Sequence, residues 1–273
     1  MKRSEKAKVV SNEMIADDIY KMVFVSEAAA AAEAGQFVHI RCSSEDTFLR
    51  RPISICKADS SSGEITVVYQ VKGSGTRAMS LIRPGENINV LGPLGNGFSI
   101  EHTFRHILLV GGGIGIYPLF NVAETYSRVS SETTVDAVLG FRSKSLVTYE
   151  KDFKELCSET TIVTDDGSYG EKGTVIAPVR RALLDNNYDM VYVCGPKPMI
   201  SAMRDLQQEL GFKCEVSLEE RMGCGVGACL VCTCKVRSGE DGKDGKNGGS
   251  WHHKHVCKDG PVFDMNDLYF ERE

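Results

Sequence analysis

The chain has 273 residues, of which 42% are hydrophobic and 25% charged, so it can bury the cores of two or three compact units. Its formal net charge of −5 gives no reason to expect nucleic acid or an anionic membrane as a partner. No apolar stretch approaches the length of a membrane span, and ten cysteines without a secretion signal favour a reduced, cytoplasmic location.

Residues 1–102 alternate short β-type runs with turn residues. Many short strands with few helical stretches are typical of an antiparallel barrel or sandwich, and we expect a barrel here. The stretch from Leu91 to Gly95 is expected to be a turn that closes it. The expected strands are Ile19–Val25, Gln36–Cys42, Pro52–Cys56, Glu64–Val71 and Asn87–Val90.

Two short motifs in this part could hold a phosphate. Arg51 precedes Pro52, which would hold the guanidinium as a rigid fork for a pyrophosphate, and Ser54 falls on the same strand face as the proline. Gly73-Ser74-Gly75-Thr76 precedes a helical stretch, and glycines that open a helix offer free N–H groups. The alternatives are an ordinary exposed Arg-Pro pair and a plain turn in which the threonine is the helix N-cap.

Residues 103–217 show a different pattern, in which apolar strands alternate with helical stretches. This alternation predicts a parallel sheet flanked by helices. The expected strands are His106–Val110, Val135–Gly140, Thr160–Thr164, Met190–Cys194 and Lys213–Ser217.

Glycines stand at the carboxyl ends of two of these strands, where sheets of this kind bind nucleotides. Gly111, Gly112, Gly113 and Gly115 follow the first strand, although they do not spell the dinucleotide fingerprint G-x-G-x-x-G. Cys194-Gly195-Pro196 ends the fourth strand, where a Gly-Pro pair can also be a simple turn. We expect both segments to line a nicotinamide-nucleotide site.

Residues 218–273 carry the most specific motif. Cys224, Cys229 and Cys232 are spaced C-x4-C-x2-C, and Cys257 follows downstream, which is the spacing by which thiolates hold a plant-type [2Fe–2S] cluster. Glycines at alternate positions would let the backbone curl around the cluster. The alternatives are a structural zinc site, which usually presents C-x2-C pairs, and a set of unrelated buried thiols.

Several neighbours complicate the choice of ligands. Cys234 is the second choice for the place of Cys232, and the histidines beside Cys257 could in principle bind a metal. Ser238–Ser250 is hydrophilic and predicts a flexible surface insertion, which makes Cys257 the least certain ligand. Of the other cysteines, four lie in or beside apolar runs and are expected to be core thiols: Cys42, Cys56, Cys157 and Cys214.

In chain order, these motifs resemble the ferredoxin-reductase superfamily, and within it the family of electron transfer subunits of NAD-dependent (type B) dihydroorotate dehydrogenase. The resemblance spans essentially the whole chain. It rests on Arg51-Pro52-Ile53-Ser54, Leu91–Asn96, Gly111–Gly115, Thr164–Ser168, Cys194-Gly195-Pro196 and Glu220–Cys229.

The resemblance implies an FAD barrel, a nucleotide domain and a [2Fe–2S] module. It implies electron flow from a separate FMN-containing catalytic subunit, which oxidises dihydroorotate in pyrimidine (UMP) biosynthesis, through the cluster and FAD to NAD+. It also implies a heterotetramer of two catalytic and two electron transfer subunits, and no catalytic residue for dihydroorotate on this chain. The implied cluster ligands are the four cysteines above, and the implied FAD contacts are Arg51, Pro52, Ile53, Ser54, Val68, Tyr69, Gln70, Gly75 and Thr76.

Three other functions stay open at this point. One is the flavin/[2Fe–2S] subunit of a related NADH-dependent ferredoxin:NADP or sulfide oxidoreductase, which shares most of the motifs. The others are a cluster-bearing adaptor that has lost its flavin and a zinc-stabilised regulatory protein. The residues also do not decide between NAD and NADP, since Arg142 and Lys144 could meet a 2′-phosphate or could simply be solvated.

Overall fold

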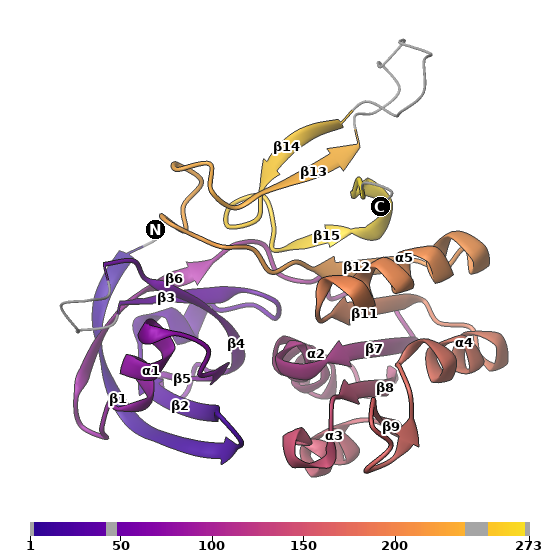
Figure 1. Ribbon diagram of the computed structural model, residues 1–273, viewed down its shortest axis with the longest axis horizontal. Coiled ribbons are helices and arrows are strands. Elements are labelled where there is room, and N and C mark those ends of the chain that lie inside the picture. The colour runs from indigo at the N-terminus through magenta and orange to yellow at the C-terminus, as the bar shows by residue number, and fades with distance from the viewer. Residues whose placement is uncertain (1–2, 42–47, 238–250, 271–273) are drawn as a thin grey trace.

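The computed structural model describes residues 3–41, 48–237 and 251–270. Figure 1 shows a barrel beside a layered α/β part, with the C-terminal segment crossing above both. The expected insertion Ser238–Ser250 and the expected core thiol Cys42 lie outside the described residues. No helix within the described ranges is both long and apolar enough to cross a membrane.

The predicted barrel is confirmed as a closed, antiparallel barrel of six strands. The first strand was not predicted, because its many lysines and glutamates mask its pairing. The sixth strand continues to Leu94 through the stretch expected to be a turn. Around the barrel the strands are β1 (Arg3–Ala16), β2 (Ile19–Val25), β5 (Glu64–Gln70), β4 (Arg51–Asp59), β3 (Phe37–Arg41) and β6 (Asn87–Leu94).

The barrel interior is filled by every second residue of its strands, as the pleat requires. Two short helical segments lie between strands of the barrel: η1 (Glu27–Ala31) follows β2, and α1 (Ser74–Ser80) follows β5. The core includes Met22, Phe24, Val38, Ile40, Ile55, Ile65, Val67 and Tyr69.

The predicted parallel sheet is confirmed as well, with each expected strand within two residues of its observed bounds. Helices α2 (Ile116–Val129) and α3 (Glu150–Leu156) cover one face, and α4 (Ile176–Asp185) and α5 (Lys197–Leu210) cover the other (Figure 1). The strand order is β10 (Glu171–Lys172), β9 (Glu159–Thr164), β8 (Thr134–Phe141), β7 (His106–Gly112), β11 (Met190–Cys194), β12 (Cys214–Ser217) and β15 (Val262–Asp264).

The C-terminal segment does not stay apart from the sheet. Its last strand, β15, pairs antiparallel with β12 at the sheet edge, and a short helical turn, η4 (Met265–Asp267), follows. Between β12 and β15 the chain forms the hairpin of β13 (Thr233–Arg237) and β14 (Trp251–His255). The segment therefore leaves the nucleotide sheet and returns to it.

The barrel packs against the α/β part through helix α2. Lys57 on β4 forms an ion pair with Glu124, and the side chain of Asn121 donates to the carbonyl of Ile55 at 3.4 Å. Buried Cys56 and Val68 belong to the same apolar cluster as α2. This packing places the outer face of strands β4 and β5 against the nucleotide-binding part.

Candidate functional site

The four cysteines of the C-terminal motif come together in two pairs. The thiols of Cys224 and Cys229 lie within hydrogen-bonding reach of each other, and so do those of Cys232 and Cys257. Cys232 and Cys257 are buried, whereas Cys229 is exposed. A [2Fe–2S] cluster needs two sulfur ligands on each iron, so a two-by-two arrangement fits its chemistry.

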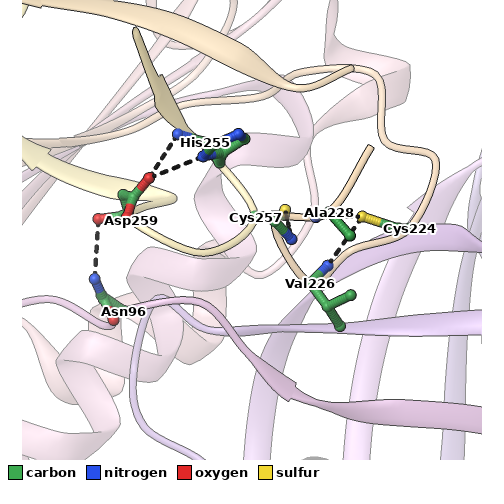
Figure 2. A network of polar contacts seen from close by, with 8 residues as sticks. Asn96, Cys224, Val226, Ala228, His255, Cys257 and Asp259 are labelled. Atoms are coloured by element: carbon green, nitrogen blue, oxygen red, sulfur yellow. Dashed lines mark hydrogen bonds and ion pairs between the residues drawn. The ribbon is translucent and has the colours of Figure 1, made fainter. Parts of the chain in front are cut away.

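Backbone amides point at these sulfurs (Figure 2). Val226 N and Ala228 N donate to Cys224 Sγ at 3.4 and 3.2 Å, and Gly227 N donates to Cys257 Sγ at 3.1 Å. Burial opposes ionisation of Cys224, but hydrogen bonds from the backbones of Val226, Ala228 and Cys229 outweigh it and lower the pKa of its thiol to about 6. A turn that stabilises thiolates in this way is prepared for a cationic iron centre.

The turn depends on glycine at two positions. Gly225 and Gly227 have φ values of +72° and +81°, a region that glycine enters without the strain that a side chain would bring. Leu230, just beyond, also has a positive φ of +59° although it is not glycine. The loop therefore adopts a conformation that bends its amides toward the sulfurs.

The segment carrying Cys257 is tied to the end of the barrel (Figure 2). Asp259 accepts from the backbone N–H of His255 at 2.7 Å and lies 3.3 Å from its ring nitrogen Nδ1. Asn96, which follows β6, donates its side-chain amide to the carbonyl of Asp259 at 2.9 Å. These bonds fix the turn on which the fourth cysteine stands.

Two of the alternative ligands, Cys234 and His255, do not join the paired thiols. Cys234 is half-buried on β13, and burial chiefly raises the pKa of its thiol to about 11. The ring of His255 is turned to Asp259. Among the described residues, no group of three or more histidine, cysteine or acidic side chains converges as the ligand set of a single metal ion.

Arg51 and Gly75, two of the implied FAD contacts, lie against each other. The guanidinium lies against Gly75 so closely that a Cβ at this position would collide with it. Thr76 is the third residue of α1 rather than the N-cap, which is Gly73. Its hydroxyl accepts from the backbone N–H groups of Lys72 and Gly73 at 2.9 and 3.2 Å, so it shapes the turn.

The remaining implied FAD residues divide between the two faces of the barrel wall. Ile53 and Tyr69 pack into the interior, where the Tyr69 hydroxyl donates to Asn12 at 3.0 Å. Strand alternation then places their neighbours on the outer face. Pro52, Ser54, Val68 and Gln70 therefore lie on the outer face, where Val68 is buried in the cluster that contains α2.

The two glycine-containing strand ends of the sheet meet at its carboxyl edge. A Cβ on Gly115 would collide with the Cys194–Gly195 peptide, so the segments are in backbone contact. Gly113 has a φ of +54°, and a Cβ there would meet no described atom within 4 Å. Gly113 is thus the open position to which a dinucleotide backbone could come close.

Gly111 and Gly112 have a different role, because they still belong to β7. A Cβ on Gly112 would lie 2.6 Å from Met199 Sδ, and one on Gly111 would lie 2.8 Å from Ile116 Cγ2. These two glycines let helices α5 and α2 pack closely on the sheet. Pro196 is the N-cap of α5 and ends the short turn that joins β11 to this helix.

Two barrel residues near the cysteine turn, His39 and Arg50, were not among the functional residues that the sequence analysis expected. His39 on β3 is fully buried, and burial, followed by the charge of Arg50, lowers its pKa to about 4, so the ring is neutral. Arg50 donates to the carbonyls of His39 and Asn89, both at 3.1 Å, and thereby joins β3 to β6. A single histidine in an apolar run gives no signal of this kind in a sequence.

Comparison with known families assigns each part of the chain. Residues 6–98 match the oxidoreductase FAD-binding domain, and residues 109–205 match the oxidoreductase NAD-binding domain. Residues 219–269 match the iron-sulfur cluster binding domain of dihydroorotate dehydrogenase B.

Full-length relatives agree with this assignment. The chain is 42% identical over 272 residues to the dihydroorotate dehydrogenase B (NAD(+)) electron transfer subunit of Geobacillus sp. (strain WCH70), covering 98% of this chain and 99% of the relative. The protein of the same name from Shouchella clausii (strain KSM-K16) is 40% identical, with 98% of each chain covered. The chain belongs to the family of dihydroorotate dehydrogenase B electron transfer subunits.

Solved structures place this family member within a wider fold. The structure of an NADH-dependent reduced ferredoxin-NADP oxidoreductase aligns with a TM-score of 0.83 at 30% identity, covering 96% of this chain and 89% of that one. The ferredoxin reductase of carbazole 1,9a-dioxygenase shares the fold alone, with a TM-score of 0.68 at 21% identity over 77% of this chain and 67% of the other. The expected ferredoxin-reductase fold is thus confirmed, and with it an NAD-linked oxidoreductase subunit that has FAD-, NAD- and cluster-binding domains.

Proposed function

We propose that the chain passes electrons from a dihydroorotate-oxidising catalytic subunit, through a [2Fe–2S] cluster and FAD, to NAD+ in pyrimidine biosynthesis. The observation that carries the proposal is the double pair of cysteines, whose turn lies directly against His39 on barrel strand β3, the neighbour of β4. The cluster exchanges single electrons and NAD+ accepts a hydride, and a flavin can exchange electrons with both. The chain itself supplies position, charge and shielding from water.

The pairing of the thiols supports a specific ligand assignment. Cys224 and Cys229 would hold one iron, and Cys232 and Cys257 the other. The N–H donors of Val226, Gly227 and Ala228 would stabilise the thiolates. Cys234 is not a ligand in this proposal, because it takes no part in either pair.

On the barrel, Arg51 would neutralise the FAD pyrophosphate beside the backbone N–H groups of Gly75 and Thr76. Pro52 and Ser54 would face the flavin, with Val68 and Gln70 on the next strand. Ile53 and Tyr69 would contribute their backbones only, as their side chains belong to the barrel core.

At the carboxyl edge of the sheet, Gly113 would receive NAD+ next to the junction of Gly115 with Cys194 and Gly195. Pro196 would hold the turn after β11. Gly111 and Gly112 would contribute by letting helices α2 and α5 pack closely on the sheet. We also infer that the chain divides into three functional parts, residues 1–102, 103–217 and 218–273. Strand β15 belongs to the third part by sequence but pairs with the sheet of the second.

The partner in this proposal is an FMN-containing dihydroorotate dehydrogenase catalytic subunit, in a heterotetramer of two catalytic and two electron transfer subunits. The cluster turn exposes the apolar side chains of Val226, Leu230 and Val231, which supports docking of a protein near the exposed Cys229. The abundance of reduced cysteines supports a cytoplasmic location.

Reconstitution tests the division of labour. The purified chain should oxidise NADH with artificial acceptors but leave dihydroorotate untouched, and addition of the FMN subunit should produce dihydroorotate-dependent reduction of NAD+. The mass of the complex by light scattering checks the two-plus-two stoichiometry. Dihydroorotate oxidation by the single chain, at the rate of the complex, would contradict the proposal.

A second candidate is favoured by one observation, the 96% coverage by the ferredoxin-NADP oxidoreductase structure at 30% identity. In that case the chain would serve a larger partner that reduces NADP+ with ferredoxin. The two candidates differ in the donor: reduced ferredoxin with NADP+ would support turnover in one complex, and dihydroorotate with NAD+ in the other. The 42% identity to a full-length dihydroorotate dehydrogenase B subunit is why we prefer the first.

A further inference from the structure

His39 lies where the barrel touches the cluster turn, and neither the cysteine motif nor the implied flavin contacts include it. It is the third residue of β3, and its register partners are Pro52 on β4 and Leu91 on β6. Val38 and Ile40 point into the barrel core, so the imidazole points outward. It is nevertheless completely buried.

The group that covers the ring is the turn between the first two cysteine ligands. A Cβ on Gly225 would lie 2.5 Å from His39 Nδ1 and 3.2 Å from Cε1, so the ring rests directly on the Cα of this glycine. The backbone of Cys224 also lies close enough to favour a proton on the ring. The side chain of His39 therefore lies between the cluster turn and strand β3, which pairs with the strand that holds Pro52.

The polar atoms of this ring are not used by the protein. Neither Nδ1 nor Nε2 completes a hydrogen bond within the described parts of the chain. Burial of unpaired polar atoms destabilises a fold, and a leucine would pack here without that cost. The backbone groups of Arg50 and Cys224 lie close enough to favour a proton on the ring, but neither completes a hydrogen bond with it. The sulfurs of a cluster held by Cys224 and Cys229 would be better acceptors for that proton.

We propose that His39 is a positioning residue for the iron–sulfur cluster. Its ring holds the Cys224–Gly227 turn on barrel strand β3, the neighbour of β4, and its imidazole N–H is available to a sulfur of the cluster. The inference rests on the proposed function, because it requires the cluster. Hydrogen-bond donors near cluster sulfurs stabilise the reduced, more negative state and so raise the reduction potential.

The test is an EPR-monitored redox titration of the cluster-containing chain. His39→Leu fills the space but removes the N–H, so the midpoint potential should shift to a more negative value at unchanged iron content. His39→Asn restores a donor and should recover part of the shift. As a matched control, His106→Gln changes a histidine at the amino end of β7, bonded to Asp136 at 2.6 Å, and should leave the potential unmoved.

A pair of glycine variants keeps the proposal testable should the leucine variant fold poorly. Gly225→Ala and Gly227→Ala both carry a positive φ and the same backbone strain, but only the first forces a methyl group into the His39 ring. His39→Ala should therefore restore cluster content to Gly225→Ala and give no benefit to Gly227→Ala. Equal effects in both backgrounds would contradict the proposal.

The outcomes separate this inference from the function on which it rests. Absence of any reduced-state cluster signal in the wild-type chain would reject the proposed function itself. A normal wild-type signal whose potential and line shape are unchanged in His39→Leu would reject only the role of His39.

Discussion

At the scale of single residues, Arg50 and Arg51 show how neighbours in sequence separate in role. Arg50 is bound to carbonyls of β3 and β6, so its charge is used inside the barrel wall. Arg51 reaches along the barrel end to Gly75, where an anion can approach it. The sequence points to Arg51 through the proline that follows it, whereas the role of Arg50 depends on the pairing of β3 with β6 and is visible only in the structure.

Replacement of Arg51 by alanine should release FAD and leave the barrel folded. Hydrogen bonds to a charged group contribute about 1.5–3 kcal/mol, which corresponds to a loss of roughly ten- to a hundredfold in affinity. FAD remaining after extensive dialysis measures the effect. Arg50→Ala is the control, since it should lower the melting temperature by detaching β3 from β6. Full retention of FAD by Arg51→Ala would rule out the assigned role.

The thiol pairs predict which cysteines the cluster needs. Cys224→Ser or Cys229→Ser should abolish the EPR signal of the reduced cluster, because each removes one of the paired ligands. Cys234→Ser should leave the signal intact, since its thiol belongs to no pair. A signal lost in Cys234→Ser and kept in Cys232→Ser would reverse the ligand assignment.

The core cysteines should be chemically inert in the native protein. Burial raises the pKa of Cys56 and Cys157 to about 12, and it raises that of Cys214 as well. At pH 8 these groups therefore remain protonated thiols rather than reactive thiolates. Alkylation with iodoacetamide, read by mass spectrometry, should spare all three and modify the exposed Cys229 in protein stripped of iron. Modification of Cys56 without unfolding would contradict the packing at the barrel interface.

At the scale of elements, strand β15 joins the cluster segment to the nucleotide sheet. Phe263 on this strand pairs with Val216 and is buried in the core beneath helix α5, and its ring lies directly against Gly260. Gly260 belongs to the same turn as Cys257. Packing of the sheet edge and placement of the fourth cysteine thus depend on one aromatic ring.

Phe263→Ala should therefore weaken two properties together. Loss of a buried phenylalanine costs about 3–5 kcal/mol, and the loosened turn should also lower the iron content. Thermal unfolding and iron analysis measure both. Leu184→Ala, at a position that is 66% exposed, should change stability by less than about 0.5 kcal/mol. A destabilised variant with full iron content would show that the position of the turn does not depend on the packing of β15.

The elements that could be predicted from sequence are those with strong local signals. The apolar runs of β7 and β11 and the alternation of β2 and β5 appear in the sequence as they do in the structure. Strand β1 was missed because its lysines and glutamates mask its pairing, and β15 because three residues are too few for a periodic pattern. The site followed the same rule: the cysteine spacing was visible, whereas burial of His39 depends on contacts between distant segments.

At the scale of the whole molecule, the C-terminal segment braces the other two parts. It leaves from β12, contacts the barrel at His39 and Asn96, and returns as β15 (Figure 1). The thiol pairs, the outer barrel face and the carboxyl edge of the sheet are in this way held by one continuous framework. Such a framework suits electron transfer, which requires fixed separations between redox groups.

The measurement that tests this account most directly is the anaerobic addition of NADH to the isolated, cofactor-loaded chain. NADH should bleach the flavin absorbance and produce the EPR signal of a reduced [2Fe–2S] cluster, whereas dihydroorotate alone should produce neither. A cluster that stays oxidised while NADH reduces the flavin, or one that dihydroorotate reduces without a partner, would contradict the proposed route.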